Sequence, residues 1–225
     1  MEPSVASTKS VRDWVQVPSA AHYDAMNYLP PDRMAAIGYQ FRLLHQYFPE
    51  GRVLEVGVGS GLAAHLLRSL NHEVATLDVD ERLNPDLLGS VTAIPSQDDS
   101  FDSFTCCQVL EHLEWKHVPD AVSELARVSA HGGVISVPTN RPTIGISLHN
   151  YHHCGSRTFR LPKLRKQRVR CPREHHWELE ANITTDQFRE VVEDTNLTII
   201  HEIQPIQMLY HHFFVVKKTN ATPRQ

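Results

Sequence analysis

Short β-branched runs alternate with amphipathic stretches along much of the chain. Nearly continuous apolar runs predict buried strands, whereas apolar positions that recur every three or four residues predict helices. The expected strands cover residues 52–57, 73–78, 101–107 and 133–137, and the expected helices cover residues 32–47, 62–70 and 119–129. Strands that alternate with helices at this spacing predict a parallel sheet with helices on both of its faces.

The C-terminal part of the chain predicts a further helix and two more strands. Thr184 and Gln187 form a capping-box pattern ahead of an apolar helical face, so a helix is expected to run to about Thr195. Two β-rich runs, residues 197–203 and 208–216, follow with only four residues between them. This spacing predicts an antiparallel pair. The fold class expected is therefore an α/β, Rossmann-like, doubly wound sheet, mostly parallel with an antiparallel C-terminal edge hairpin.

A length of 225 residues fits one domain. Residues 1–20 are polar and unpatterned; an N-terminal arm is expected over residues 1–31 and a disordered tail over residues 218–225. The domain itself is expected at 32–217. Within it, residues 138–180 are rich in Pro, His, Arg and Asn and too long for a plain connection, so they are expected to be an insertion that acts as a substrate lid.

Composition narrows the class of protein. No window reaches the ~18 apolar residues of a spanning helix, and the first 20 residues lack a signal-peptide core. Four cysteines are too few for a disulfide scaffold. We therefore expect a soluble, cytoplasmic protein with no membrane partner.

The charge is unevenly distributed. The net charge is −4, yet residues 160–173 hold seven basic residues and no acidic one, which leaves 15 basic against 26 acidic residues elsewhere. This basic run could steer an anionic acceptor toward a site. Phe159 is the only aromatic neighbour of the run, so it lacks the stacking side chains typical of nucleic-acid binding, and an anionic small molecule or glycan is preferred over RNA. Oligomeric state is left open.

The strongest local signal is a strand that leads directly into a glycine turn and a helix. Three glycines alternate at Gly57, Gly59 and Gly61, and the next expected strand ends at Asp78. Closely spaced glycines let a ligand approach the backbone, and an acid at the end of the second strand can accept hydrogen bonds from ribose hydroxyls. The dinucleotide fingerprint needs a small residue at the sixth position, where this chain has Leu62. A cationic adenosine cofactor above Glu55 fits better, and S-adenosylmethionine (SAM) is such a cofactor.

Five segments in this order resemble the class I SAM-dependent methyltransferases, most closely the type 11 methyltransferase-domain group. They are EVGVGSG (55–61), TLDVD (76–80), AIPSQDDSFD (93–102), QVLEHL (108–113) and ARVSAHGGVISVP (126–138). The resemblance implies that SAM is held by Glu55, Gly57, Gly59, Gly61, Asp78, Val79, Ala93, Ile94 and Gln108. One motif departs: Gly89 is followed by Ser90 where many relatives carry an acid for adenine. Ser90, or the pair Asp98 and Asp99, is the expected replacement.

Methyl transfer to oxygen needs a group that takes up the acceptor's proton. His112, beside Glu111, follows the expected strand 101–107. His175 lies in a Glu-His-His-Trp-Glu run that resembles one in some type 11 relatives. The catalytic residues expected are His175, His112 and Glu111, with transfer to oxygen and no metal.

Three alternatives remain open at this point. Small-RNA 2′-O-methyltransferases carry an E-x-x-E-H stretch and a later histidine that bind a divalent ion; Glu111, His112 and His175 match, but Gln108 replaces the first acid. A metal-assisted RNA methyltransferase is therefore one alternative, and transfer to nitrogen is a second. A SAM-binding accessory protein without turnover is the third.

Overall fold

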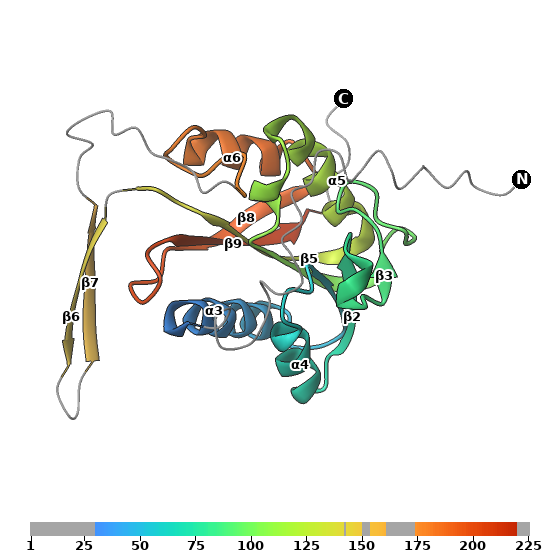
Figure 1. The fold of residues 1–225 in the computed structure, drawn as a ribbon, viewed down its shortest axis with the longest axis horizontal. Coiled ribbons are helices and arrows are strands. Elements are labelled where there is room, and N and C mark those ends of the chain that lie inside the picture. Colours follow the sequence, from blue (N-terminus) through green and yellow to red (C-terminus); the bar gives the residue numbers. More distant parts are fainter. Residues whose placement is uncertain (1–29, 142, 150–153, 161–173, 220–225) are drawn as a thin grey trace, which may run out of the picture.

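A seven-stranded sheet forms the centre of the protein, with helices on both faces (Figure 1). The computed structural model describes residues 30–141, 143–149, 154–160 and 174–219, with no side-chain description for 143–149 and 154–160. The strand order is β3-β2-β1-β4-β5-β9-β8. The first five strands in this order run parallel, and β9 pairs antiparallel with both β5 and β8. The predicted fold class is confirmed.

The predicted elements are present with small shifts of their ends. The strands are β1 Arg52–Val56, β2 Glu73–Asp78, β3 Leu87–Leu88, β4 Phe101–Cys107, β5 Ser129–Pro138, β6 Thr143–His149, β7 Cys154–Arg160, β8 Leu197–Ile203 and β9 His211–Lys218. The α-helices are α3 Pro31–Tyr47, α4 Leu62–Ser69, α5 Val118–Val128 and α6 Thr185–Glu193. Short 3₁₀ turns η2 Glu81–Leu83, η3 Leu110–His112 and η4 Trp115–His117 lie between them.

The sheet separates two hydrophobic layers. One contains buried side chains of α5 and α6, including Val122, Leu125 and Phe188. The other contains buried side chains of α3 and α4, including Leu44 and Leu67. Figure 1 shows these helix pairs on opposite sides of the sheet. Burial of a continuous apolar face against each side is the main stabilising contribution to this arrangement.

Strand β5 begins at Ser129, before the predicted start at residue 133. Gly133 was expected as the first residue of the strand, and Gly132 lies inside the strand as well. A Cβ on Gly132 would lie 2.1 Å from the Val216 carbonyl oxygen, and one on Gly133 would lie 2.2 Å from that of Phe104. The two glycines therefore permit close approach of the neighbouring strands, as isolated strand glycines often do.

The closing helix and strands also form. Thr184 Oγ1 accepts from the Gln187 N–H and the Gln187 side chain accepts from the Thr184 N–H, so the predicted capping box is present. The antiparallel pair β8–β9 is confirmed, although β9 starts at His211 rather than 208. The His211 N–H donates to the Met208 carbonyl in a turn, which lengthens the connection.

Residues 138–180 contain a two-stranded antiparallel sheet, β6–β7, that the sequence did not predict. Figure 1 shows this hairpin standing apart from the central sheet. The last part of this stretch, from Glu174 onward, returns to the central sheet, where the Leu179 N–H donates to the Pro138 carbonyl at 3.0 Å. Residues 1–29 of the N-terminal arm, residues 161–173 of the basic run and the tail beyond residue 219 lie outside the described residues.

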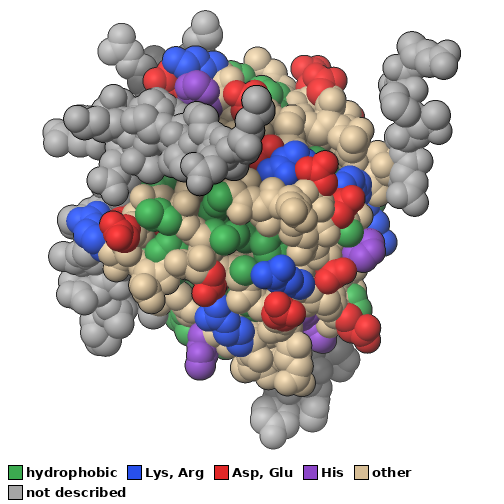
Figure 2. Space-filling model, turned by 90° about the vertical axis from the view of Figure 1, so that its right-hand side faces the viewer, with side chains coloured by type: hydrophobic (Ala, Val, Ile, Leu, Met, Phe, Trp, Pro, Cys, Tyr) green, Lys and Arg blue, Asp and Glu red, His purple; other side chains and the backbone are tan. Residues whose placement is uncertain are grey.

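Charge on the described surface is mixed. On the face shown in Figure 2, basic and acidic side chains alternate around a group of hydrophobic ones. Among the described helices, none is long and apolar enough to cross a membrane.

Candidate functional site

A cavity of about 310 Å³ opens beyond the carboxyl ends of β1, β2 and β4. A smaller cavity of about 70 Å³ adjoins it, between the glycine loop and α3. Both cavities are lined by Arg33, Gly57, Gly59, Cys107, Gln108 and His211. The chain runs outward from β1 to β3 and returns on the other side of β1 with β4, so the cavity lies where strand order reverses. This is the position at which open α/β sheets bind ligands.

The glycine loop adopts a backbone that other residues rarely adopt. Gly57, Gly59 and Gly61 have φ of 83°, 53° and 72°, in the left-handed region. A Cβ on Gly57 would also lie 2.6 Å from a methyl carbon of Val109. Gly57 and Gly59 line both cavities, whereas Gly61 caps the N-terminus of α4. The loop thus presents bare backbone to any ligand in the cavity.

Glu55 lies beneath this loop and lines the smaller cavity. Only 3% of its surface is exposed, and its Oε2 has no hydrogen-bond partner among the described residues. Burial raises the pKa of Glu55 to about 8, and the charge of Arg68 opposes this shift. A buried carboxyl with an unpaired oxygen is suited to receive a donor or a positive charge from a ligand.

Asp78 ends β2 and lines the larger cavity together with Val79. Burial raises the pKa of Asp78, although the N–H groups of Asp80 and Val58 donate to its carboxylate at 2.9 Å each and favour the charged form. Asp80, two residues further along the chain, instead caps η2 and pairs with Arg82 at 2.6 Å. Of the two acids, Asp78 is the one that lines the cavity.

Gly89, Ser90 and Val91 also line the larger cavity. Ala93 and Ile94 are not among the residues that line the two cavities. Ile94 is a core residue with 4% exposure, and its N–H donates to Glu124 Oε2 at 2.8 Å.

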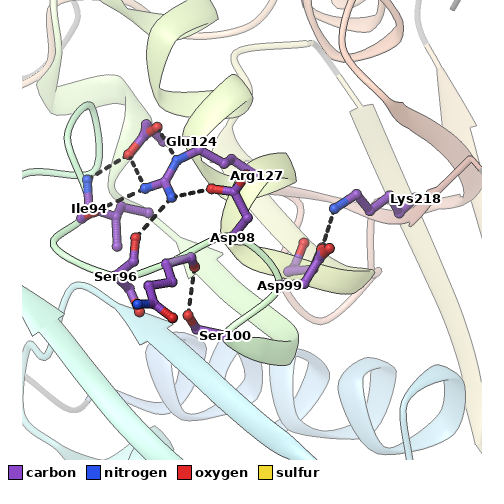
Figure 3. A network of polar contacts seen from close by, with 10 residues as sticks. Ile94, Ser96, Asp98, Asp99, Ser100, Glu124, Arg127 and Lys218 are labelled. Carbon is purple, nitrogen blue, oxygen red and sulfur yellow. Dashed lines mark hydrogen bonds and ion pairs between the residues drawn. The ribbon is translucent and has the colours of Figure 1, made fainter.

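The acidic pair proposed as a substitute is engaged elsewhere. Arg127 pairs with Asp98 at 2.8 Å and Lys218 pairs with Asp99, which fastens their loop to α5 and β9 (Figure 3). Arg127 also donates to Glu124, and this hydrogen bond is the main cause that lowers the pKa of Glu124. Ser90, whose Oγ lies 2.9 Å from Thr92 Oγ1, is the proposed replacement that does line the cavity.

The opposite end of the cavity begins directly after β4. Gln108 has a left-handed φ of 58°, and its N–H donates to the Ser136 carbonyl at 2.9 Å. Glu111 follows in η3 with no exposed surface, and neither of its carboxylate oxygens has a hydrogen-bond partner among the described residues. Burial raises the pKa of Glu111 to about 7, while the nearby His175 lowers it.

His112 lines the same end. Its Nδ1 lies 2.8 Å from the backbone carbonyl oxygen of Glu174. A carbonyl only accepts, so Nδ1 carries the proton and Nε2 holds a lone pair. Burial lowers the pKa of His112 to about 4, so the ring is neutral near pH 7.

His175 lies against His112, with ring centroids 5.1 Å apart. Its Nδ1 lies 2.8 Å from Oε1 of the fully buried Glu178. Burial alone would lower the pKa of His175, but the hydrogen bond to Glu178 and the charges of Glu111 and Glu178 raise it overall. The Glu178 carboxylate thus holds Nδ1 and leaves Nε2 for the cavity, which His175 lines.

The fold therefore brings Glu111, His112 and His175 together, although 63 residues separate His112 from His175. One potential ligand atom of each lies within 4.8 Å of the others. Sequence reasoning missed two polar partners at this end, Glu178 and Tyr210. Glu178 belongs to the Glu-His-His-Trp-Glu run and so had a signal nearby. Tyr210 comes from the β8–β9 connection, where no motif indicated a functional residue.

A family model described as "Methyltransferase domain" matches residues 54–137. This segment contains the glycine loop, the end of β2 and the turn after β4. A search of curated proteins found no match.

Solved structures share the fold over most of their length. A 1,6-didemethyltoxoflavin-N1-methyltransferase from Burkholderia thailandensis, with 1,6-didemethyltoxoflavin and S-adenosylhomocysteine bound, has a TM-score of 0.62 at 14% identity, over 98% of this chain and 94% of that one. A SAM-dependent methyltransferase from Aquifex aeolicus has a TM-score of 0.55 at 16% identity, over 84% and 94%. PH0226 protein from Pyrococcus horikoshii OT3 has a TM-score of 0.59 at 13% identity, over 88% and 93%. Residues 54–137 therefore match a methyltransferase domain, and the chain shares its fold with solved SAM-dependent methyltransferases.

Proposed function

We propose that this SAM-dependent methyltransferase transfers the methyl group to an oxygen of a small-molecule or glycan acceptor. The observation that carries the proposal is the convergence of Glu111, His112 and His175 on one end of a cavity whose other end has the features of a cofactor site. SAM is the methyl donor of the family, so the remaining questions are where it lies and what it methylates.

The two adjoining cavities would together hold an extended cofactor. The adenosine part would lie in the larger cavity, with Asp78 and Val79 at the ribose and Ser90 at the adenine. The methionine part would enter the smaller cavity, where the unpaired oxygen of Glu55 meets its ammonium group. The sulfonium then falls where the cavities join, beside Gln108. Ala93 and Ile94, which were expected to hold SAM, do not line either cavity. The proposal keeps them only as part of the loop that follows Ser90 and Val91.

The histidine end would then receive the acceptor. Methyl transfer is an in-line displacement, so much of the rate comes from holding the acceptor oxygen against the methyl group. The oxygen must also lose its proton, and Nε2 of His175 is the base we propose. The imidazolium formed at His175 is stabilised by Glu178, which contacts Nδ1 at 2.8 Å. A neutral amine is nucleophilic without prior loss of a proton, so an amine acceptor has less need of such a base.

Recognition of an anionic acceptor would need more cationic side chains than the described cavity lining supplies. The described lining of the larger cavity carries one guanidinium, Arg33, and the carboxylates Asp32, Asp78, Glu111 and Glu174. An anionic acceptor would therefore be recognised by the basic run at 160–173. Substitution of Arg165, Lys166 and Arg168 by Ser should raise its KM, more so at low salt. An unchanged KM would argue for a neutral acceptor.

A product assay tests the proposed function. The protein is incubated with SAM and matched acceptor sets that offer hydroxyl, amine or activated carbon groups, and S-adenosylhomocysteine release is followed together with the mass of the product. We expect release with a hydroxylated acceptor and methylation at that oxygen. Turnover only with amines would overturn the oxygen assignment, and tight SAM binding without turnover in any set would indicate an accessory protein.

Metal-assisted transfer is a second candidate, and the same cluster favours it. Two histidines and one carboxylate with open positions are a common set for divalent transition-metal ions such as Mn²⁺, Co²⁺ and Zn²⁺. Both histidines have Nδ1 fixed by an oxygen, as metal-bound histidines usually do, and the buried Glu111 carboxylate lacks a hydrogen-bond partner among the described residues. Glu111, His112 and His175 would hold the ion, which supplies Lewis-acid activation of the acceptor hydroxyl.

EDTA distinguishes the two candidates. Under the base mechanism, chelation leaves turnover unchanged. Under the metal-assisted mechanism, chelation abolishes turnover, Mn²⁺ restores it, and an RNA with a free 3′ end joins the acceptor sets. The Glu111→Gln variant should lose the Mn²⁺ response while retaining SAM affinity.

A further inference from the structure

Two residues outside the predicted site converge on His175. Glu178 Oε1 accepts a hydrogen bond from the Tyr210 hydroxyl at 2.5 Å and contacts His175 Nδ1 at 2.8 Å. The Tyr210 hydroxyl itself lies 3.4 Å from the same ring nitrogen. Glu178 has no exposed surface, whereas Tyr210 lines the larger cavity.

The backbone around both residues is fixed by the end of β5. The Leu179 N–H donates to the Pro138 carbonyl at 3.0 Å, and the Thr139 N–H donates to the Tyr210 carbonyl at 2.8 Å. The Glu178 N–H is held by Asn182 Oδ1 at 2.9 Å. Two segments that are far apart in the sequence are therefore anchored to one strand end, and this brings their side chains together at His175.

This arrangement determines which ring nitrogen of His175 carries the proton. An ionised carboxylate can only accept hydrogen bonds, so an oxygen that already receives the Tyr210 hydroxyl draws the ring proton to Nδ1. Nε2 is then left with its lone pair. Without these partners, a neutral imidazole would populate both tautomers and rotate about its side-chain bonds.

We propose that Glu178 and Tyr210 are positioning residues that hold His175 in the Nδ1–H tautomer with Nε2 toward the acceptor. The proposal rests on the proposed function for its kinetic consequence, because His175 must meet the acceptor for its tautomer to matter. The positioning role of Glu178 and Tyr210 is the same whether His175 acts as a base or as a metal ligand, since both roles use the lone pair of Nε2.

Glu178→Gln and Tyr210→Phe test this. The Gln amide can donate to Nδ1 and so favours the wrong tautomer; we expect kcat to fall by ~10² to 10⁴, with acceptor KM and SAM affinity within about twofold. Tyr210→Phe removes one of two contacts, and we expect kcat to fall roughly tenfold. Tyr39→Phe is the matched control, because the Tyr39 hydroxyl donates to Gln207 in the same β8–β9 connection at 2.8 Å and does not reach His175.

A tautomer measurement separates positioning from mere stability. Two-bond ¹H–¹⁵N correlations of the histidine rings, with the His175 signals identified by their loss in His175→Ala, should show Nδ1–H in the wild type and the Tyr39→Phe control. Glu178→Gln should shift the ring toward Nε2–H, and Tyr210→Phe should show a mixture. An unchanged tautomer in both variants, or kcat losses no larger than in Tyr39→Phe, would overturn the proposal. The expected tautomers without turnover on any acceptor would instead count against the proposed function alone.

Discussion

The Asp78 carboxylate accepts a hydrogen bond from the backbone N–H of Val58 at 2.9 Å, which ties the end of β2 to the glycine loop after β1. The acid that is proposed to hold the ribose therefore also shapes the loop that faces the cofactor. This hydrogen bond joins the two motifs although they lie 20 positions apart in the sequence. It also makes the effect of substitution at Asp78 predictable.

Asp78→Ala should weaken S-adenosylhomocysteine binding by ~10- to 100-fold, because charge-assisted hydrogen bonds contribute about 1.5–3 kcal/mol. Isothermal titration calorimetry measures this directly. Asp86→Ala is the control: its carboxylate accepts from the Thr76 N–H at 2.9 Å on the same strand but is not among the residues that line the cavities. Equal losses of affinity in the two variants would contradict a ligand-binding role for Asp78.

Gly57→Ala and Gly61→Ala should differ in stability, although both positions have positive φ. Gly61→Ala carries only the backbone strain, about 1–2 kcal/mol, because a Cβ there has no other atom within 4 Å. Gly57→Ala adds a 2.6 Å approach to Val109 and should cost more. Urea unfolding of both variants beside Gly38→Ala, which meets neither restriction, provides the comparison. Equal costs at Gly57 and Gly61 would show that Val109 moves aside freely.

His175→Ala should lower kcat by ~10² to 10⁴ with little change in SAM affinity, as expected for a group that acts in the transition state. His112→Ala should have a smaller effect under the base mechanism and an equally large effect if both rings hold an ion. Steady-state kinetics with and without EDTA separates these outcomes. A loss below tenfold in both variants would mean that positioning of the acceptor carries the rate.

Glu202 should contribute stability that depends on pH. Burial opposes its ionisation, but hydrogen bonds from His212 and Arg189 lower the pKa of Glu202 to about 2, below its ordinary value of 4.5. The contribution is therefore fully present above pH 4.5 and is lost as pH falls toward 2. Glu202→Gln should destabilise the protein by roughly 1–2 kcal/mol at pH 7, with the difference shrinking as pH approaches 3.

Urea unfolding at both pH values measures this difference. Glu190→Gln, an exposed glutamate on α6, is the control and should change stability by less than about 0.5 kcal/mol. A difference between Glu202→Gln and the wild type that is the same at both pH values would rule out a stabilising contribution from the charge of Glu202.

Local features of the chain were well determined by sequence. Apolar periodicity predicted the order of strands and helices, and the Thr184–Gln187 capping box formed as expected, because these signals act between residues within one or two turns. The alternation of glycines before Asp78 likewise indicated where a cavity lies, and Gly57, Gly59 and Asp78 line it. Short-range patterns missed the first four residues of β5, which begins at Ser129 rather than at Gly133 and approaches its neighbouring strands closely at Gly132 and Gly133.

Only the tertiary structure decided which side chains meet. Sequence spacing gives no distance between His112 and His175, nor does it indicate that Tyr210 reaches Glu178 across 32 residues. It also could not decide between Ser90 and the acidic pair, which is drawn to Arg127 and Lys218 on other elements. These contacts depend on how β5, β9 and the segment before α6 pack together, and packing is set by the whole core rather than by any local pattern.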